Sequence, residues 1–135
     1  MESAPKPDVN LYLLVDGTKL AKINAMQSEM ATANVTITGL MSGDALTSID
    51  FRPATGELYG VSMMNRLYVI NQETGMARVI GATALNPTIS GTAVGLDFNP
   101  TVDRIRLVTN TGQNLRIHPE TGAVAATDGV INGGM

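Results

Sequence analysis

Short apolar segments separated by turn-forming residues recur along the whole chain. In the middle third, the pattern predicts four strands, each bounded by Gly, Pro, Asn or Asp. These strands cover residues 46–51, 58–62, 67–71 and 77–80. Four short strands joined by tight turns within about 40 residues are typical of an antiparallel meander. The pattern therefore predicts an all-β protein.

The same pattern recurs at an offset of 47 residues. The matched segments are Asp50–Pro53 with Asp97–Pro100, Glu73–Gly75 with Glu120–Gly122, and, one period earlier, Leu11–Asn24 with Leu58–Asn71. A fixed period of roughly 20–50 residues indicates a repeat architecture, and this length is typical of a four-stranded propeller blade. The chain is thus predicted to hold three tandem blades, at about residues 8–42, 45–83 and 92–130.

The two flanking units follow the middle one, with one gap. The predicted strands are 10–15, 19–24 and 34–40 in the first unit, and 92–98, 104–109, 114–118 and 123–127 in the third. The dipeptide Asp16-Gly17 predicts a hairpin turn. Residues 25–33 are assigned to a turn and an outer strand, with a short helix as the alternative. The repeat places the inner strand of the first unit at or before residues 1–4, so blade 1 is expected to lack it.

Three blades form only part of a propeller, because closed propellers have about four to eight blades. Two apolar blade faces would stay open, and exposed apolar faces mark interaction surfaces. We expect the chain to be a homo-oligomer, either a ring of two chains with six blades or a head-to-tail filament. The tail Gly129–Asn132 of a neighbouring copy is a candidate to complete blade 1. The candidate contact residues are Tyr12, Leu14, Met63, Met64, Val130 and Ile131.

The alternative is a fragment of a longer secreted propeller, which would bind a small ligand or a cation in its central channel and could be an enzyme. Asp50 and Asp97 end equivalent inner strands, where carboxylates could hold a calcium-like cation. Each Asp could instead cap its own blade by bonding turn amides. No other cofactor is implied. Asp103, Arg104 and Arg106 are expected to form a solvated hairpin with an ion pair, with anion binding as the alternative.

Composition narrows the classes of function. The net charge is −3 and the nine Lys and Arg residues are scattered, which does not fit a nucleic-acid partner. No apolar run reaches the roughly 18 residues of a membrane span, and residues 1–10 do not resemble a signal peptide. The chain has no cysteine, and His118 is its single histidine, expected in a turn. These counts argue against a transition-metal site or a catalytic triad, so a non-enzymatic role is favoured.

Two longer motifs carry a family resemblance. Residues Leu46–Gly75 and Asp97–Gly122 contain DFRPATGELY and DFNPTVDRIRLVTNTGQNLR. These two sequence motifs resemble the successive repeats of an uncharacterised bacterial family, domain of unknown function 4394. The resemblance implies a propeller-like repeat protein that is secreted or displayed on the cell surface and has no established activity. It supplies no catalytic residue, and it implies relatives longer than this chain.

Overall fold

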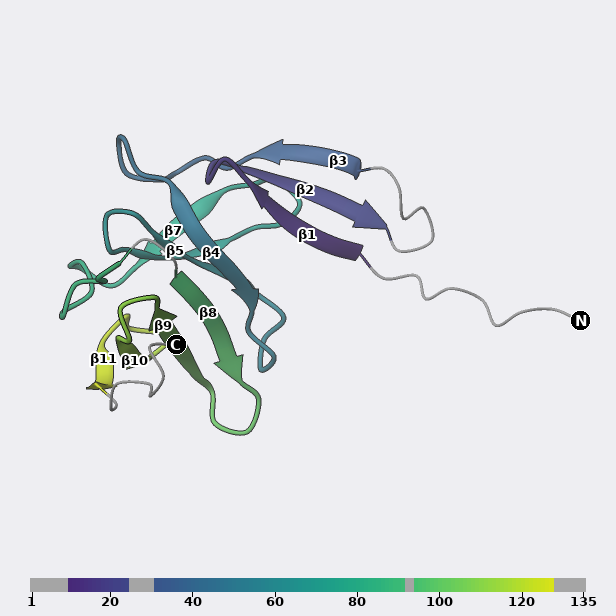
Figure 1. The fold of residues 1–135 in the computed structure, drawn as a ribbon. Coiled ribbons are helices and arrows are strands. Elements are labelled where there is room, and N and C mark those ends of the chain that lie inside the picture. Colours follow the sequence, from purple (N-terminus) through teal and green to yellow (C-terminus); the bar gives the residue numbers. More distant parts are fainter. Residues whose placement is uncertain (1–9, 25–30, 92–93, 128–135) are drawn as a thin grey trace, which may run out of the picture.

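The computed structural model describes residues 10–24, 31–91 and 94–127, which form three antiparallel sheets and no helix (Figure 1). Blade 1 consists of β1 (Asn10–Val15), β2 (Lys19–Asn24) and β3 (Ala31–Thr36). Blade 2 consists of β4 (Leu46–Phe51), β5 (Leu58–Ser62), β6 (Leu67–Ile70) and β7 (Ala77–Ile80). Blade 3 consists of β8 (Val94–Asn99), β9 (Arg104–Thr109), β10 (Asn114–Ile117) and β11 (Val124–Thr127). The prediction of an all-β, propeller-like array is confirmed.

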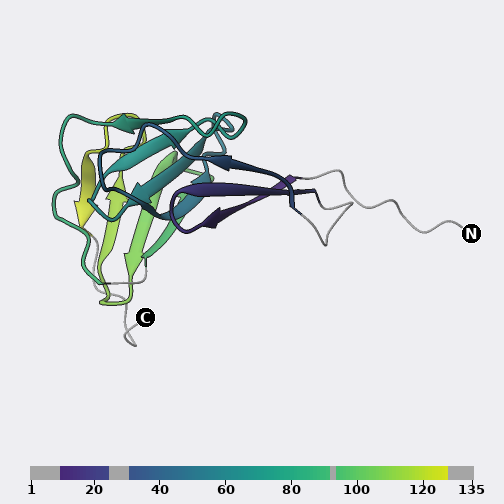
Figure 2. The same cartoon turned by 90° about the horizontal axis from the view of Figure 1, so that it is seen from above.

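The three sheets follow one another in chain order. Strand β4 contacts both β1 and β8, so the first strands of blades 2 and 3 are neighbours (Figure 1). Figure 2 shows blade 1, in purple and blue, projecting from one side of the molecule, away from blade 3 in green and yellow. Blade 2 is therefore the only sheet, among the described residues, with another sheet against each of its faces.

Blade 2 separates two apolar cores. All residues of β5 and β6 are buried, because successive side chains of a strand point to opposite faces and both faces of this blade are covered. The core between blades 1 and 2 consists of Leu20, Ile37, Leu46, Leu58, Tyr68, Ile70 and Ala77. The core between blades 2 and 3 includes Tyr59, Val61, Leu67, Phe98, Ile105, Leu107, Leu115 and Ile117. The consecutive apolar positions of β5 and β6 thus reflect burial on both sides.

The strand predicted over residues 34–40 is confirmed only for residues 34–36. The strand of this region is β3, which ends at Thr36, and Thr38 then forms a parallel bridge with Met76 of blade 2. The hydrogen-bond ladder of blade 1 ends here because the chain crosses from the first sheet to the second. The crossing is close, because a Cβ on Gly75, whose φ is 77°, would lie 2.2 Å from the carbonyl oxygen of Thr36. Of the segment 25–33, predicted as a turn and an outer strand, residues 31–33 belong to β3, and residues 25–30 lie outside the described part of the chain. The remaining predicted strands match the observed ones to within two residues at either end.

Candidate functional site: contacts between blades and the open blade faces

A buried ion pair with several hydrogen bonds joins blades 2 and 3 through Arg52. This arginine follows β4 and is only 6% exposed. Its Nε donates to both carboxylate oxygens of Asp103, at 3.0 and 3.1 Å, and its Nη2 donates to Asp103 Oδ2 as well. Its Nη1 donates to the hydroxyl of Tyr59 at 3.1 Å. Because a bidentate pair fixes both partners in orientation, this contact holds the turn before β9 against blade 2.

The pKa values of the two partners of Arg52, Asp103 and Tyr59, are shifted in opposite directions. The hydrogen bond from Arg52 holds the pKa of Asp103 below its usual range. Burial raises the pKa of the Tyr59 hydroxyl, although the neighbouring Arg52 opposes the shift. Glu57 and Glu120 lie 3.9 and 3.8 Å from the guanidinium, but both are well exposed and so add little. Asp103 is therefore the main anionic partner of Arg52.

We expect the stability of the chain to fall in acid because of Asp103. A carboxyl whose pKa is lowered on folding contributes stability above its unfolded pKa of about 3.9 and loses it as the pH falls through the folded value. Asp103→Asn should reduce the free energy of unfolding by about 1–2 kcal/mol at pH 7, a range lowered because a third of the side chain is open to water. Urea denaturation at several pH values should show the difference shrinking below about pH 4.

The matched control for this titration is Glu120→Gln, since Glu120 is 70% exposed. This variant should change the free energy of unfolding by less than about 0.5 kcal/mol at any pH. If the wild-type and Asp103→Asn chains lost stability in parallel as the pH fell, the Arg52–Asp103 pair would not be the acid-sensitive contact.

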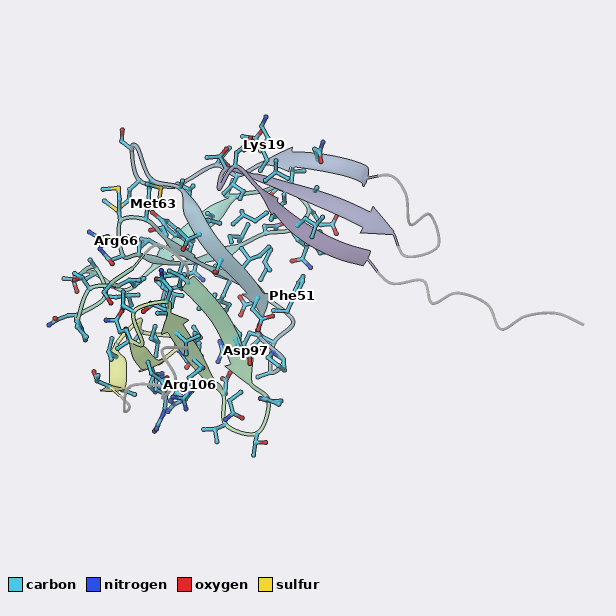
Figure 3. The ribbon with its side chains drawn as sticks, viewed as in Figure 1. Lys19, Phe51, Met63, Arg66, Asp97 and Arg106 are labelled. Atoms are coloured by element: carbon cyan, nitrogen blue, oxygen red, sulfur yellow. The ribbon has the colours of Figure 1, made fainter. Side chains whose placement is uncertain are left out.

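The inner strands of blades 2 and 3 are joined by two further hydrogen bonds. The backbone N–H of Phe98 donates to Asp50 Oδ2 at 2.9 Å, and the hydroxyl of Ser48 donates to the carbonyl oxygen of Val94. The carboxylate of Asp50 thus binds an amide of the neighbouring blade, and not a turn amide of its own blade. Asp97, its repeat equivalent, is exposed on β8, the last inner strand of the described array (Figure 3).

An edge-to-face aromatic pair recurs at each contact between blades. Tyr12 meets Phe51 with ring centroids 5.6 Å apart, and Tyr59 meets Phe98 at 5.3 Å. Tyr12 lies 47 positions before Tyr59, and Phe51 lies 47 positions before Phe98. Such pairs add stability beyond their buried area. The repeat therefore conserves the contact between blades within this chain.

Blade 3 breaks this series on its open face. The position that follows Tyr12 and Tyr59 in the repeat is Arg106, labelled in Figure 3. Arg106 donates to the side chain of Asn114 at 2.7 Å. With Arg104 and Arg116 it lines a shallow hollow of about 190 Å³, which Asn99, Val102 and Ile105 complete. The open face of blade 3 is thus rich in arginine.

The open face of blade 1 is apolar by comparison. Leu13 and Val15 of β1 are 52% and 39% exposed. They alternate with Tyr12, which stacks on Phe51, and with Leu14, which packs on the core between blades 1 and 2. Lys19 lies opposite Val15 in the ladder and so shares its face.

The structure distributes the predicted site residues over different parts of the molecule. Of the contact candidates, Tyr12 and Leu14 face blade 2, whereas Met63 and Met64 lie in the turn between β5 and β6. Val130 and Ile131 lie outside the described residues, as does the tail Gly129–Asn132. Leu13 and Val15 were missed, although the alternation of a strand places them opposite Tyr12 and Leu14. Their exposure makes Leu13 and Val15 new candidates for contact with another chain.

The predicted polar site residues also lie in different parts of the molecule. Asp50 binds the Phe98 amide and Asp97 is exposed, and the described residues contain no group of three or more His, Asp or Glu side chains placed to hold a metal. Asp103, expected to pair within its own hairpin, reaches Arg52 of blade 2 instead. His118 lies in the turn after β10, and its Nδ1 is buried with no partner among the described residues. Arg52 was missed, because its partner is 51 residues away in the sequence.

Comparison with known proteins identifies the family. The model of the family described as Domain of unknown function (DUF4394) matches residues 19–134. The chain belongs to this family. The search of curated proteins found no match to this DUF4394 chain. Its described residues include no helix long and apolar enough to cross a membrane.

Solved structures support the propeller-like fold of the DUF4394 chain. Apo AztD from Citrobacter koseri is similar with a TM-score of 0.55 and 14% identity, over 93% of this chain and 32% of that one. A second crystal structure of Citrobacter koseri AztD is similar with a TM-score of 0.56 and 14% identity, over 90% and 31% of the two chains. The DUF4394 chain thus spans about a third of the length of AztD, and at this identity the likeness concerns the fold.

Proposed function

We propose that the chain is a non-enzymatic interaction module that self-associates through its open blade faces. The observation that carries the proposal is the exposure of Leu13 and Val15 on β1. Both lie on the face of blade 1 that no described sheet covers, while the opposite face is packed against blade 2. Apolar side chains grouped on one sheet face lose contact with water when another surface covers them.

The charged contacts between the blades support an interaction role over a catalytic one. Arg52 and Asp103 bind each other and join two blades. Asp50 binds the backbone of the next inner strand. Each of these groups therefore has a structural partner.

Two assemblies follow from contact between blade 1 of one copy and blade 3 of another. If the rotation closes, two copies form a ring of six blades; if it does not, the copies form a filament. Lys19 on one face and Arg104, Arg106 and Arg116 on the other are positive, and they outnumber the negative Asp97, which lies opposite Arg106 in the ladder of blade 3. The contact must therefore be driven by apolar burial, and salt should strengthen it by screening the repulsion.

The test is the mass of the chain in solution over a range of concentrations, by sedimentation equilibrium. We expect a dimer or a larger, concentration-dependent species, and a larger associated fraction at higher salt. The double variant Leu13→Lys, Val15→Lys should shift the chain to monomer, because it places two more positive charges at the contact. The control is Val79→Lys on β7, an exposed valine of blade 2, which should associate like the wild type.

A monomer at every concentration and salt would contradict self-association. It would favour the alternative that further blades of a longer polypeptide cover both faces. Retained association in the Leu13, Val15 variant would instead show that the contact lies on another surface.

A further inference from the structure

Three methionines gather at one end of blade 2, away from the open faces of blades 1 and 3. Met41 precedes β4, and Met63 and Met64 form the turn between β5 and β6. They are 41%, 66% and 43% exposed. Figure 3 shows sulfur atoms grouped beside the labelled Met63. Methionine is usually among the buried side chains, so exposed methionines on two adjacent loops require an explanation.

A buried aspartate holds these two loops together. Asp44 is 7% exposed, and its Oδ1 accepts hydrogen bonds from the backbone N–H groups of Ala45 and Met64, at 2.9 and 3.1 Å. Its Oδ2 accepts the hydroxyl proton of Tyr68 at 2.9 Å, and the Tyr68 oxygen accepts the backbone N–H of Met41 at 3.1 Å. The backbone N–H of Met63 donates to the carbonyl oxygen of Ala45 at 2.8 Å. The backbone at all three methionines is therefore fixed around one carboxylate.

The repeat shows that the fold does not need methionine at these places. The turn between β9 and β10 has the same backbone bonds as the turn between β5 and β6, with Thr109 N bonded to Gln113 O as Ser62 N is to Arg66 O. The repeat equivalents of the methionines are Thr88, Asn110 and Thr111. In blade 3 this region is joined by polar contacts, such as the one between the hydroxyls of Ser90 and Thr111 at 2.6 Å. The methionines are thus a property of blade 2 and not of the blade architecture.

The atoms available as metal ligands on these two loops are methionine sulfurs, which are soft ligands. The carboxylate of Asp44 is buried and bonded to two amides and a hydroxyl, so it is occupied. The chain has no cysteine, and its one histidine lies in blade 3. The neutral thioether sulfurs of Met41, Met63 and Met64 are left as exposed ligands on a fixed backbone. Thioether ligands select soft monovalent ions such as Cu(I) over Zn²⁺, Mg²⁺ or Ca²⁺.

We propose that Met41, Met63 and Met64 form a binding site for a soft monovalent metal ion of the Cu(I) or Ag(I) class. The ion binds three sulfur atoms at the surface, and Asp44 and Tyr68 position the loops without touching it. The site lies outside the blade faces, so it does not depend on self-association.

Titration of the full chain with Ag(I) in chloride-free buffer tests the site, followed by the methyl NMR signals of the methionines and by native mass spectrometry. We expect one tightly bound ion per chain and shifted signals of Met41, Met63 and Met64, with no binding of Zn²⁺ under the same conditions. The triple variant Met41→Leu, Met63→Leu, Met64→Leu should weaken Ag(I) binding by more than about tenfold. Leucine keeps the size and apolar character of methionine, so the fold and any apolar contact at this patch are retained.

The matched control is Met76→Leu, since Met76 is 63% exposed but lies in the turn before β7. It should bind Ag(I) like the wild type, and Asp44→Asn should weaken binding without removing a ligand. Circular dichroism establishes that each variant is folded. The proposal is overturned if the folded wild-type chain binds no Ag(I), or if the triple variant binds it as tightly as the wild type.

Discussion

Phe98→Ala is expected to lower the free energy of unfolding by about 3–5 kcal/mol, the usual cost of removing a buried phenylalanine ring. Phe98 is 3% exposed in the core between blades 2 and 3, and its ring meets that of Tyr59 edge to face at 5.3 Å. Loss of the ring leaves a cavity in the apolar core between the two sheets. Urea denaturation followed by far-ultraviolet circular dichroism measures the change.

The repeat supplies the control for this experiment. Phe51 occupies the equivalent position between blades 1 and 2, but it is only half-buried. Phe51→Ala should therefore cost less, about 1–2 kcal/mol. If Phe98→Ala does not fold, Phe98→Leu gives a smaller loss that can still be measured. Equal losses at the two positions would show that the two contacts between blades are equally packed, which would contradict the burial described above.

Arg52→Ala is expected to cost about 2–3 kcal/mol, which is below the usual 3–5 kcal/mol for breaking a buried ion pair because Asp103 is partly open to water. The change removes the donors to Asp103 and to the Tyr59 hydroxyl at the same time. The remaining carboxylate and phenol lie between two blades without that partner. The midpoint of urea denaturation at pH 7 reports the loss.

Arg78→Ala is the matched control, because Arg78 is an exposed arginine on β7 of the same blade. It should change the free energy of unfolding by less than about 0.5 kcal/mol. A double-mutant cycle with Asp103→Ala should give a coupling energy of about 1–3 kcal/mol. A coupling near zero would mean that Arg52 stabilises the chain through packing of its aliphatic part alone.

Much of the fold could be predicted from periodicity. The 47-residue offset places equivalent turns at Glu73–Gly75 and Glu120–Gly122, and both turns join a third and a fourth strand. A run of consecutive apolar residues, as in LYVI and in LYLLV, predicts burial on both faces of a strand. This prediction is confirmed for β6, which is buried throughout, but it is wrong for β1, where Leu13 and Val15 are exposed because no described sheet covers that face. These features follow from local chemistry, since turn residues and apolar runs act within a few positions of one another. The end of β3 could not be predicted from local chemistry, because Thr38 pairs with Met76 of blade 2 and no longer with the first sheet.

The candidate site was predictable only in part. The repeat marks Asp50 and Asp97 as equivalent, but only the packing of two inner strands shows that Asp50 binds the Phe98 amide. The repeat gives no signal for Arg52, because the equivalent position in the third unit is Asn99. The pairing of Arg52 with Asp103 thus depends on how two neighbouring sheets are placed, which no local pattern specifies. The methionine site has the same origin, since it joins loops 20 residues apart through Asp44.

By itself, the sequence determined that the chain is an array of three β units, because a fixed period and turn chemistry can be recognised along the chain without knowledge of its packing. The sequence also determined that the middle unit is covered on both faces. The tertiary structure alone decided which charges join the blades and which apolar side chains remain open. In β1, Tyr12 faces the neighbouring sheet and Leu13 faces water. The reason is physical: a strand offers both of its faces, and the position of the next sheet determines which one is buried.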